Sequence, residues 1–103
     1  MTDRTALFRA VMPAELEDIK VYRRFRNPPQ THYKYFALEP EGATQYARLA
    51  RDRFAVGPFT LVETSIPKSA ISWEMRARVD GGIETLAIRT PWLSLLTTTM
   101  LLV

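Results

Sequence analysis

The sequence contains 103 residues, of which 47% are hydrophobic and 24% charged, with a formal net charge of +3 and no cysteine. This length indicates one domain, residues 1–103, and the apolar content argues against intrinsic disorder. The lack of cysteine excludes disulfide scaffolds and thiolate zinc sites. No apolar run reaches the roughly 20 residues of a membrane span and no signal peptide is present, so we expect a cytoplasmic protein without a membrane partner.

The first half of the chain predicts two strands and two helices. Thr5–Val11 is an apolar run suited to a strand, and Pro13 fits the first turn of a short helix, Pro13–Lys20. The prolines of Asn27-Pro28-Pro29-Gln30 indicate a loop, after which the aromatic-rich segment His32–Leu38 favours a strand. Pro40 then opens a longer helix, in which apolar residues repeat at helical spacing: Ala43, Tyr46, Ala47, Ala50 and Phe54.

The second half predicts an antiparallel sheet. Phe59–Ile66 is rich in strand-forming residues, and apolar and charged residues alternate over Trp73–Val79. Asp80-Gly81-Gly82 is typical of a tight hairpin turn, and Glu84–Ile88 is the returning strand. Two shorter elements complete the chain, a helical turn over Trp92–Leu96 and a last strand over Thr98–Val103. The predicted class is therefore α+β, with both helices in the N-terminal half.

Five of the fourteen basic residues gather in one stretch that contains no acidic residue. This stretch also holds the only histidine, His32, and its cations are Lys20, Arg23, Arg24, Arg26 and Lys34. Arginine binds phosphate through two parallel hydrogen bonds, so the stretch suits an anionic ligand, a nucleotide or a nucleic acid. The alternative is a solvated basic loop that aids solubility, and a net charge of +3 alone does not indicate nucleic-acid binding.

Metal and nucleophile chemistry find little support, because one histidine, no cysteine and no glycine-rich phosphate loop are present. Two carboxylates stand on strand faces. Glu63 lies mid-strand, and Glu84 shares a face with Leu86 and Ile88, where we expect it to border a cleft. The alternative for either residue is a surface glutamate paired with an arginine. Arg9 interrupts an apolar strand, so it lies either on the wet face or beside an acidic partner.

The order of these segments resembles that of a known family. The series begins with Leu7-Phe8-Arg9, a short acidic helix and Arg24-Phe25, continues with Lys34-Tyr35-Phe36-Ala37 and a helix, and ends with the strand that leads into Pro67-Lys68-Ser69. It is similar to the small bacterial toxin domains of the ADP-ribosyltransferase fold, of the TreTu type. The resemblance covers roughly residues 5–96.

The resemblance implies a split antiparallel β-sandwich that binds NAD, the co-substrate, in its central cleft without a metal. Arg9 would bind the NAD phosphates or ribose. The segment Lys34-Tyr35-Phe36-Ala37 would also contact NAD, with Tyr35 or Phe36 near the nicotinamide. Glu84 would be the catalytic carboxylate, because cleavage of the nicotinamide–ribose bond builds positive charge on the sugar. Lysine cannot reproduce the planar fork of arginine, so we expect Arg9→Lys to weaken NAD binding. Because lysine keeps the charge, we expect little effect on folding.

Two departures from the family pattern leave the acceptor open. Ala37-Leu38-Glu39 follows Phe36 where the family carries Ser-Thr-Ser, and Gly82 stands where arginine-modifying members carry a second glutamate. The first hypothesis is an enzyme that modifies an intracellular macromolecule, with a bacterial protein as the acceptor and an immunity or host protein as a further partner. The second is an inert domain of the same fold, a phage or mobile-element module that binds a protein. The third is a nucleic-acid-binding protein that uses the basic stretch.

Overall fold

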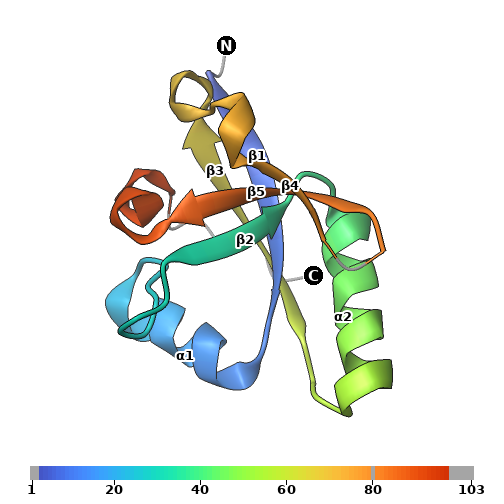
Figure 1. Cartoon of the computed structure of the whole chain (residues 1–103). Coiled ribbons are helices and arrows are strands. Elements are labelled where there is room, and N and C mark those ends of the chain that lie inside the picture. Colours follow the sequence, from blue (N-terminus) through green and yellow to red (C-terminus); the bar gives the residue numbers. More distant parts are fainter. Residues whose placement is uncertain (1–2, 80, 98–103) are drawn as a thin grey trace.

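A computed structural model describes residues 3–79 and 81–97 as an α+β fold built on one five-stranded antiparallel sheet (Figure 1). The strand order is β3-β1-β2-β5-β4. The strands are β1 (Arg4–Val11), β2 (Tyr33–Ala37), β3 (Thr60–Pro67), β4 (Arg76–Val79) and β5 (Ile83–Arg89). The helices are α1 (Pro13–Tyr22) and α2 (Pro40–Phe54), with short 3-10 helices η1 (Lys68–Ala70), η2 (Trp73–Met75) and η3 (Thr90–Leu95). The predicted α+β class is confirmed.

The sheet is divided between β1 and β2. These strands share a single register pair, Phe8 with Ala37, within the described residues. By contrast, β1 pairs with β3 from Arg4 to Val11, and β2 pairs with β5 from Tyr33 to Ala37. Figure 1 shows β1 and β3 crossing β2 and β5 at a steep angle. The C-terminal half of β1 therefore diverges from the N-terminal half of β2.

Both helices begin and end where the sequence predicts or close to it. Pro13 and Pro40 occupy the first turns of α1 and α2, where a missing N–H costs no hydrogen bond. Each helix ends at a left-handed residue, Arg23 (φ 59°) and Ala55 (φ 54°), whose N–H donates to a carbonyl of the last turn. The predicted helices over Pro13–Lys20 and from Pro40 are thus confirmed, and α1 extends two residues further.

Apolar side chains form a cluster on each face of the sheet, because successive residues of a strand point to opposite faces. Leu7 belongs to the larger cluster, which α1 and η3 cover with Ile19 and Leu93. Phe8 packs against the smaller cluster, which α2 covers with Ala43. The larger cluster contains Leu7, Val11, Ile19, Phe25, Phe36, Val62, Ile66, Met75, Leu86, Ile88, Leu93 and Leu96.

The predicted strand over Trp73–Val79 is wrong in its first half. Trp73–Met75 forms the 3-10 helix η2, in which the Met75 N–H donates to the Ser72 carbonyl at 3.1 Å. An alternating pattern of only four apolar residues does not distinguish a tight turn from a strand, and Trp73 is 81% exposed. The hairpin after β4 is confirmed by the Gly82 N–H, which donates to the Val79 carbonyl at 3.2 Å.

The C-terminal part of the sequence prediction is tested only in part. The predicted helical turn over Trp92–Leu96 is found as η3, Thr90–Leu95. The predicted strand over Thr98–Val103 lies outside the described residues. Within the described part of the chain, the search for a helix with the length and apolar character of a membrane span found none.

Candidate functional site

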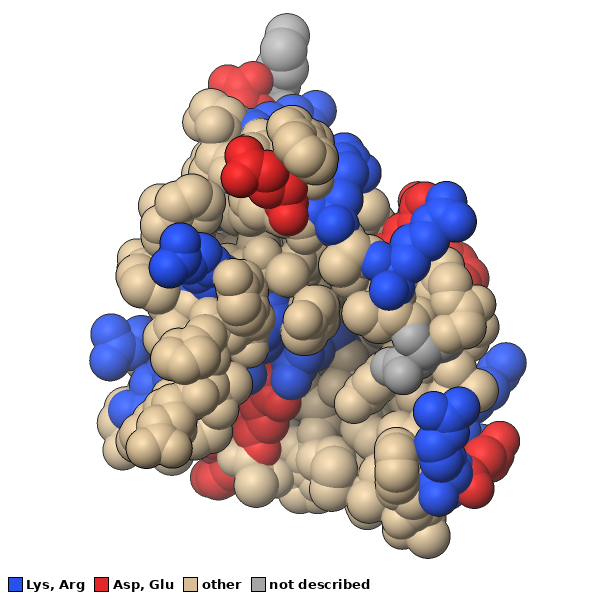
Figure 2. Space-filling model, in the orientation of Figure 1, with Lys and Arg blue, Asp and Glu red and all other residues tan. Residues whose placement is uncertain are grey.

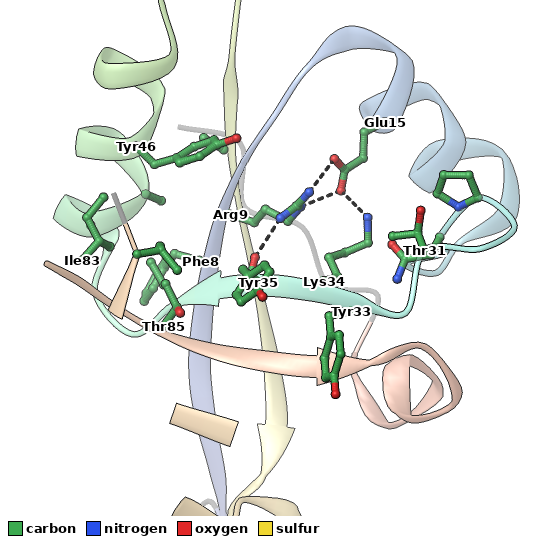
Figure 3. A pocket seen from close by; sticks show the side chains of 17 residues that line it. Phe8, Arg9, Glu15, Thr31, Tyr33, Lys34, Tyr35, Tyr46, Ile83 and Thr85 are labelled. Atoms are coloured by element: carbon green, nitrogen blue, oxygen red, sulfur yellow. Dashed lines mark hydrogen bonds and ion pairs between the residues drawn. The ribbon is translucent and has the colours of Figure 1, made fainter. Parts of the chain in front are cut away.

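A cavity of about 570 Å³ opens where β1 and β2 diverge (Figure 3). β1, β2, α2, β5 and the loop that precedes β2 all contribute to its walls. In the orientation of Figure 1, Figure 2 shows basic and acidic side chains meeting in a hollow at the centre of this face. Charged and aromatic residues among those that line it include Arg9, Glu15, Lys34, Tyr33, Tyr35 and Tyr46. The volume of the cavity lies within the range of roughly 300–1,000 Å³ that is usual for small-molecule sites.

Arg9 links the two diverging strands. It lies on β1 just beyond the single register pair, and its Nη1 donates to the Tyr35 carbonyl of β2 at 2.8 Å. Its Nε and Nη2 donate to the two carboxylate oxygens of Glu15 at 2.7 and 3.1 Å. The guanidinium also lies over the Phe36 ring, 5.8 Å from its centroid. Of the two placements that the sequence left open, the structure shows the paired one.

Lys34 brings a second cation to the same carboxylate. Its side chain is only 6% exposed, and its Nζ donates to Glu15 Oε2 at 3.0 Å. Burial and the neighbouring charge of Arg9 lower the pKa of Lys34, and the Glu15 carboxylate offsets only part of that effect. One carboxylate therefore faces two cations in a partly buried position.

Glu15 is the site residue that the sequence analysis missed. Burial alone would raise the pKa of Glu15, but its hydrogen bonds to Arg9 and Lys34 and their charges hold the pKa below its ordinary value of 4.5. Met12 alone separates β1 from α1, so the first turn of α1 follows Arg9 closely. An acidic residue six positions after a strand arginine, across so short a connection, is the pattern that would have indicated the pair.

Three tyrosine side chains are among the other residues that line the cavity. Tyr33 and Tyr35 project from the same face of β2, and Tyr46 projects from α2 (Figure 3). Phe36 points to the opposite face, where it is fully buried and meets the Phe25 ring edge-on at 5.2 Å. The structure thus brings the predicted residues Lys34, Tyr35 and Ala37 to the cavity with Arg9, and it places the predicted Phe36 in the core.

Glu84 lies apart from this cavity. Its neighbours Ile83 and Thr85 line the cavity, whereas the Glu84 side chain is 64% exposed and its Oε1 lies 3.4 Å from Arg78 Nη2. Glu84 shares the face of Leu86, as predicted, and it lines a separate hollow of about 300 Å³ together with Leu38 and Arg78, but its side chain is exposed there rather than sheltered. The reason is its place at the hairpin end of β5, where its cross-strand partner Arg78 is also exposed.

The basic stretch from Lys20 to Lys34 is partly neutralised by carboxylates of α1. Lys34 is buried against Glu15, and Arg26 forms an ion pair with Asp18 at 3.0 Å. The Arg26 guanidinium also stacks over Tyr22, 3.5 Å from the ring centroid. Two of its five cations are therefore already paired with carboxylates of α1.

A search of residues 3–79 and 81–97 found no cluster of three or more potential metal-ligating His, Cys, Asp or Glu side chains. Comparisons with protein-family models, with curated proteins and with solved structures found no match to this chain.

Proposed function

We propose that this protein is an NAD-dependent ADP-ribosyltransferase, of the ADP-ribosyltransferase-like split-sandwich fold, that modifies a protein inside the bacterial cell. The observation that carries the proposal is the position of Arg9 and Lys34 at a cavity between two diverging strands. The single register pair between β1 and β2 supports a split sheet. The donors of a guanidinium fork and an ammonium group suit the oxygens of a diphosphate.

The aromatic lining supports a ligand that carries flat rings. Tyr33, Tyr35 and Tyr46 offer ring faces on two sides of the cavity, where nicotinamide or adenine can stack. Their hydroxyl groups can also donate hydrogen bonds to ribose or amide oxygens. Arg9 and Lys34 would then hold the phosphates between the rings, and the chain would orient NAD with the ribose toward β5.

In this proposal Glu84 supplies the carboxylate that stabilises positive charge on the ribose as the nicotinamide bond breaks. Its side chain lies on the face of β5 opposite to the cavity-lining Ile83 and Thr85. Transfer therefore requires the hairpin end to turn Glu84 toward the cavity. Gly81 and Gly82, with φ of 86° and 100°, precede it by three and two residues and lie in the turn.

A second candidate function is favoured by the position of Glu84. A carboxylate that is 64% exposed and paired with Arg78 is also what an inert domain of this fold would show. In that case the domain binds a partner protein, with or without NAD in the cavity. The two functions share one fold and differ in whether ADP-ribose is transferred from NAD to a protein, so an activity measurement separates them.

The test combines calorimetric titration with NAD and transfer from labelled NAD to proteins of a bacterial lysate. We expect wild type to bind NAD, Arg9→Lys to bind it more weakly, and Glu84→Gln to bind it equally well. Glu84→Gln should reduce transfer by a factor on the order of 100 or more. Glu63→Gln is the control, because Glu63 lies on β3 opposite Phe8 and should leave transfer unchanged.

Each result has one consequence. Wild type that fails to bind NAD would refute the proposed ligand. Binding without any labelling would favour the inert domain, and loss of transfer in Glu63→Gln with full transfer in Glu84→Gln would show that the wrong glutamate was assigned.

A further inference from the structure

The cations that suit a phosphate ligand are already bound to a carboxylate of the protein itself. Glu15 accepts hydrogen bonds from Arg9 Nε, Arg9 Nη2 and Lys34 Nζ at 2.7, 3.1 and 3.0 Å. Within residues 3–79 and 81–97, it is the one carboxylate that forms an ion pair with either cation. A planar fork and an ammonium group that converge on two oxygens form the geometry of an anion-binding site.

The charges in this site do not balance. Two cations share one carboxylate, and Lys34 is almost fully buried, so the site carries an excess positive charge. Isolated charge is costly to bury, which makes an anion of higher charge the better partner for Arg9 and Lys34. A diphosphate carries at least two negative charges and offers more acceptor oxygens than a carboxylate.

Glu15 has space to leave the two cations. Its side chain lines the 570 Å³ cavity on one side and, on the other, a hollow of about 970 Å³ that Arg24 also lines. A rotation of the side chain toward that hollow, which Lys34 also lines, would take the carboxylate away from Arg9. The helix that carries Glu15 is also lightly anchored, since Ile19 is the one residue of α1 that is buried in the described structure.

We infer that the Glu15 carboxylate occupies the phosphate position of the Arg9–Lys34 site and that a diphosphate group of the ligand binds by displacing it. The inference rests on the ligand site of the proposed function, and it adds a residue that opposes binding. Glu15 thereby selects against singly charged anions, which gain too little from the exchange, and it keeps the buried cations paired while no ligand is bound.

The test uses inorganic pyrophosphate, titrated by calorimetry at constant ionic strength into wild type, Glu15→Gln and Asp18→Asn. Removal of the competing carboxylate should strengthen pyrophosphate binding by about tenfold or more, because at least one charge-assisted hydrogen bond no longer has to be broken. Asp18→Asn is the matched control. It removes an equal charge and one ion pair from the same helix, but Asp18 pairs with Arg26 and reaches Lys34 only through the longer-range effect of its charge, so affinity should change less than about twofold.

A measurement on wild type covers the case in which Glu15→Gln fails to fold. The carboxyl carbon of Glu15 is followed by NMR during acid titration, with and without saturating pyrophosphate. Displacement should return the pKa of Glu15 toward its ordinary value, because the carboxylate loses both cations. A pKa that stays low while pyrophosphate shifts the Arg9 side-chain resonances would overturn the inference.

A parallel titration with NAD separates this inference from the proposed function. Tighter pyrophosphate binding by Glu15→Gln with no NAD binding by either protein would support the displacement and refute the NAD proposal. Equal NAD binding by both proteins, with no gain for pyrophosphate, would overturn the displacement and leave the proposed function standing. Weaker pyrophosphate binding by Glu15→Gln would also overturn it, because Glu15 would then be a residue that positions Arg9 for the ligand.

Discussion

Arg9→Lys should destabilise the protein although it preserves the charge, which corrects the expectation from the sequence that it would have little effect on folding. A lysine ammonium can keep one contact with Glu15, but it cannot reproduce the fork at 2.7 and 3.1 Å together with the bond to the Tyr35 carbonyl at 2.8 Å. The exchange thus removes two hydrogen bonds of the charged guanidinium, one to a carboxylate and one to a neutral carbonyl. Because the side chains of Arg9 and Glu15 are about one quarter exposed, we expect a loss of about 2–3 kcal/mol in the free energy of unfolding.

Urea denaturation at neutral pH measures this loss, with Arg26→Lys as the matched control. Arg26 forms the same kind of fork, with Nε and Nη2 donating to the Asp18 carboxylate at 3.2 and 3.0 Å, but this pair lies on the surface. Its exchange should leave the midpoint unchanged within error. Equal losses in the two variants would refute the reasoning, since burial and the link to β2 distinguish Arg9. A double-mutant cycle of Arg9→Lys with Glu15→Gln isolates the pair's own contribution.

Three further predictions concern the core, the contact of α2 with the sheet, and pH. Phe36→Ala should lower the free energy of unfolding by about 3–5 kcal/mol in urea, whereas Phe54→Ala, an exposed position on α2, should change it by less than about 0.5 kcal/mol. Gly42→Ala should lower the free energy of unfolding by about 1 kcal/mol, because the added Cβ would lie 3.0 Å from Ile83 Cγ2. A higher melting temperature would contradict this and show that α2 moves away from β5. The folded-state pKa of Glu15 lies below its ordinary 4.5, so its stabilisation is complete above that pH and is lost as the pH falls through the folded value. The stability difference between wild type and Glu15→Gln should therefore be constant near neutral pH and shrink below 4.5, and a difference that grows on acidification would contradict the pairing.

Most element boundaries could be predicted because they depend on local chemistry. Pro13 and Pro40 begin helices since their ring geometry suits a first turn, and Gly81 and Gly82 adopt the positive φ that the predicted hairpin needs. The alternation along β3 and the return along β5 follow from one buried face. The segment that begins at Trp73 could not be predicted from local pattern, because alternation over a few residues fits a 3-10 turn as well as a strand.

The sequence by itself therefore determined the α+β class and the presence of a charged residue, Arg9, within an apolar strand. Only the tertiary structure decided which residues surround it. Glu15 follows Arg9 across a one-residue connection, but Lys34 joins them because β1 and β2 separate after a single register pair, a long-range event that no local pattern encodes. Likewise, the Glu84 side chain lies on the predicted face of β5. Its exposure, however, depends on where the packed elements end and not on the sequence of its own strand. Local propensity places residues on strands and helices, whereas the pairing of distant strands decides which charges meet and how far water reaches them.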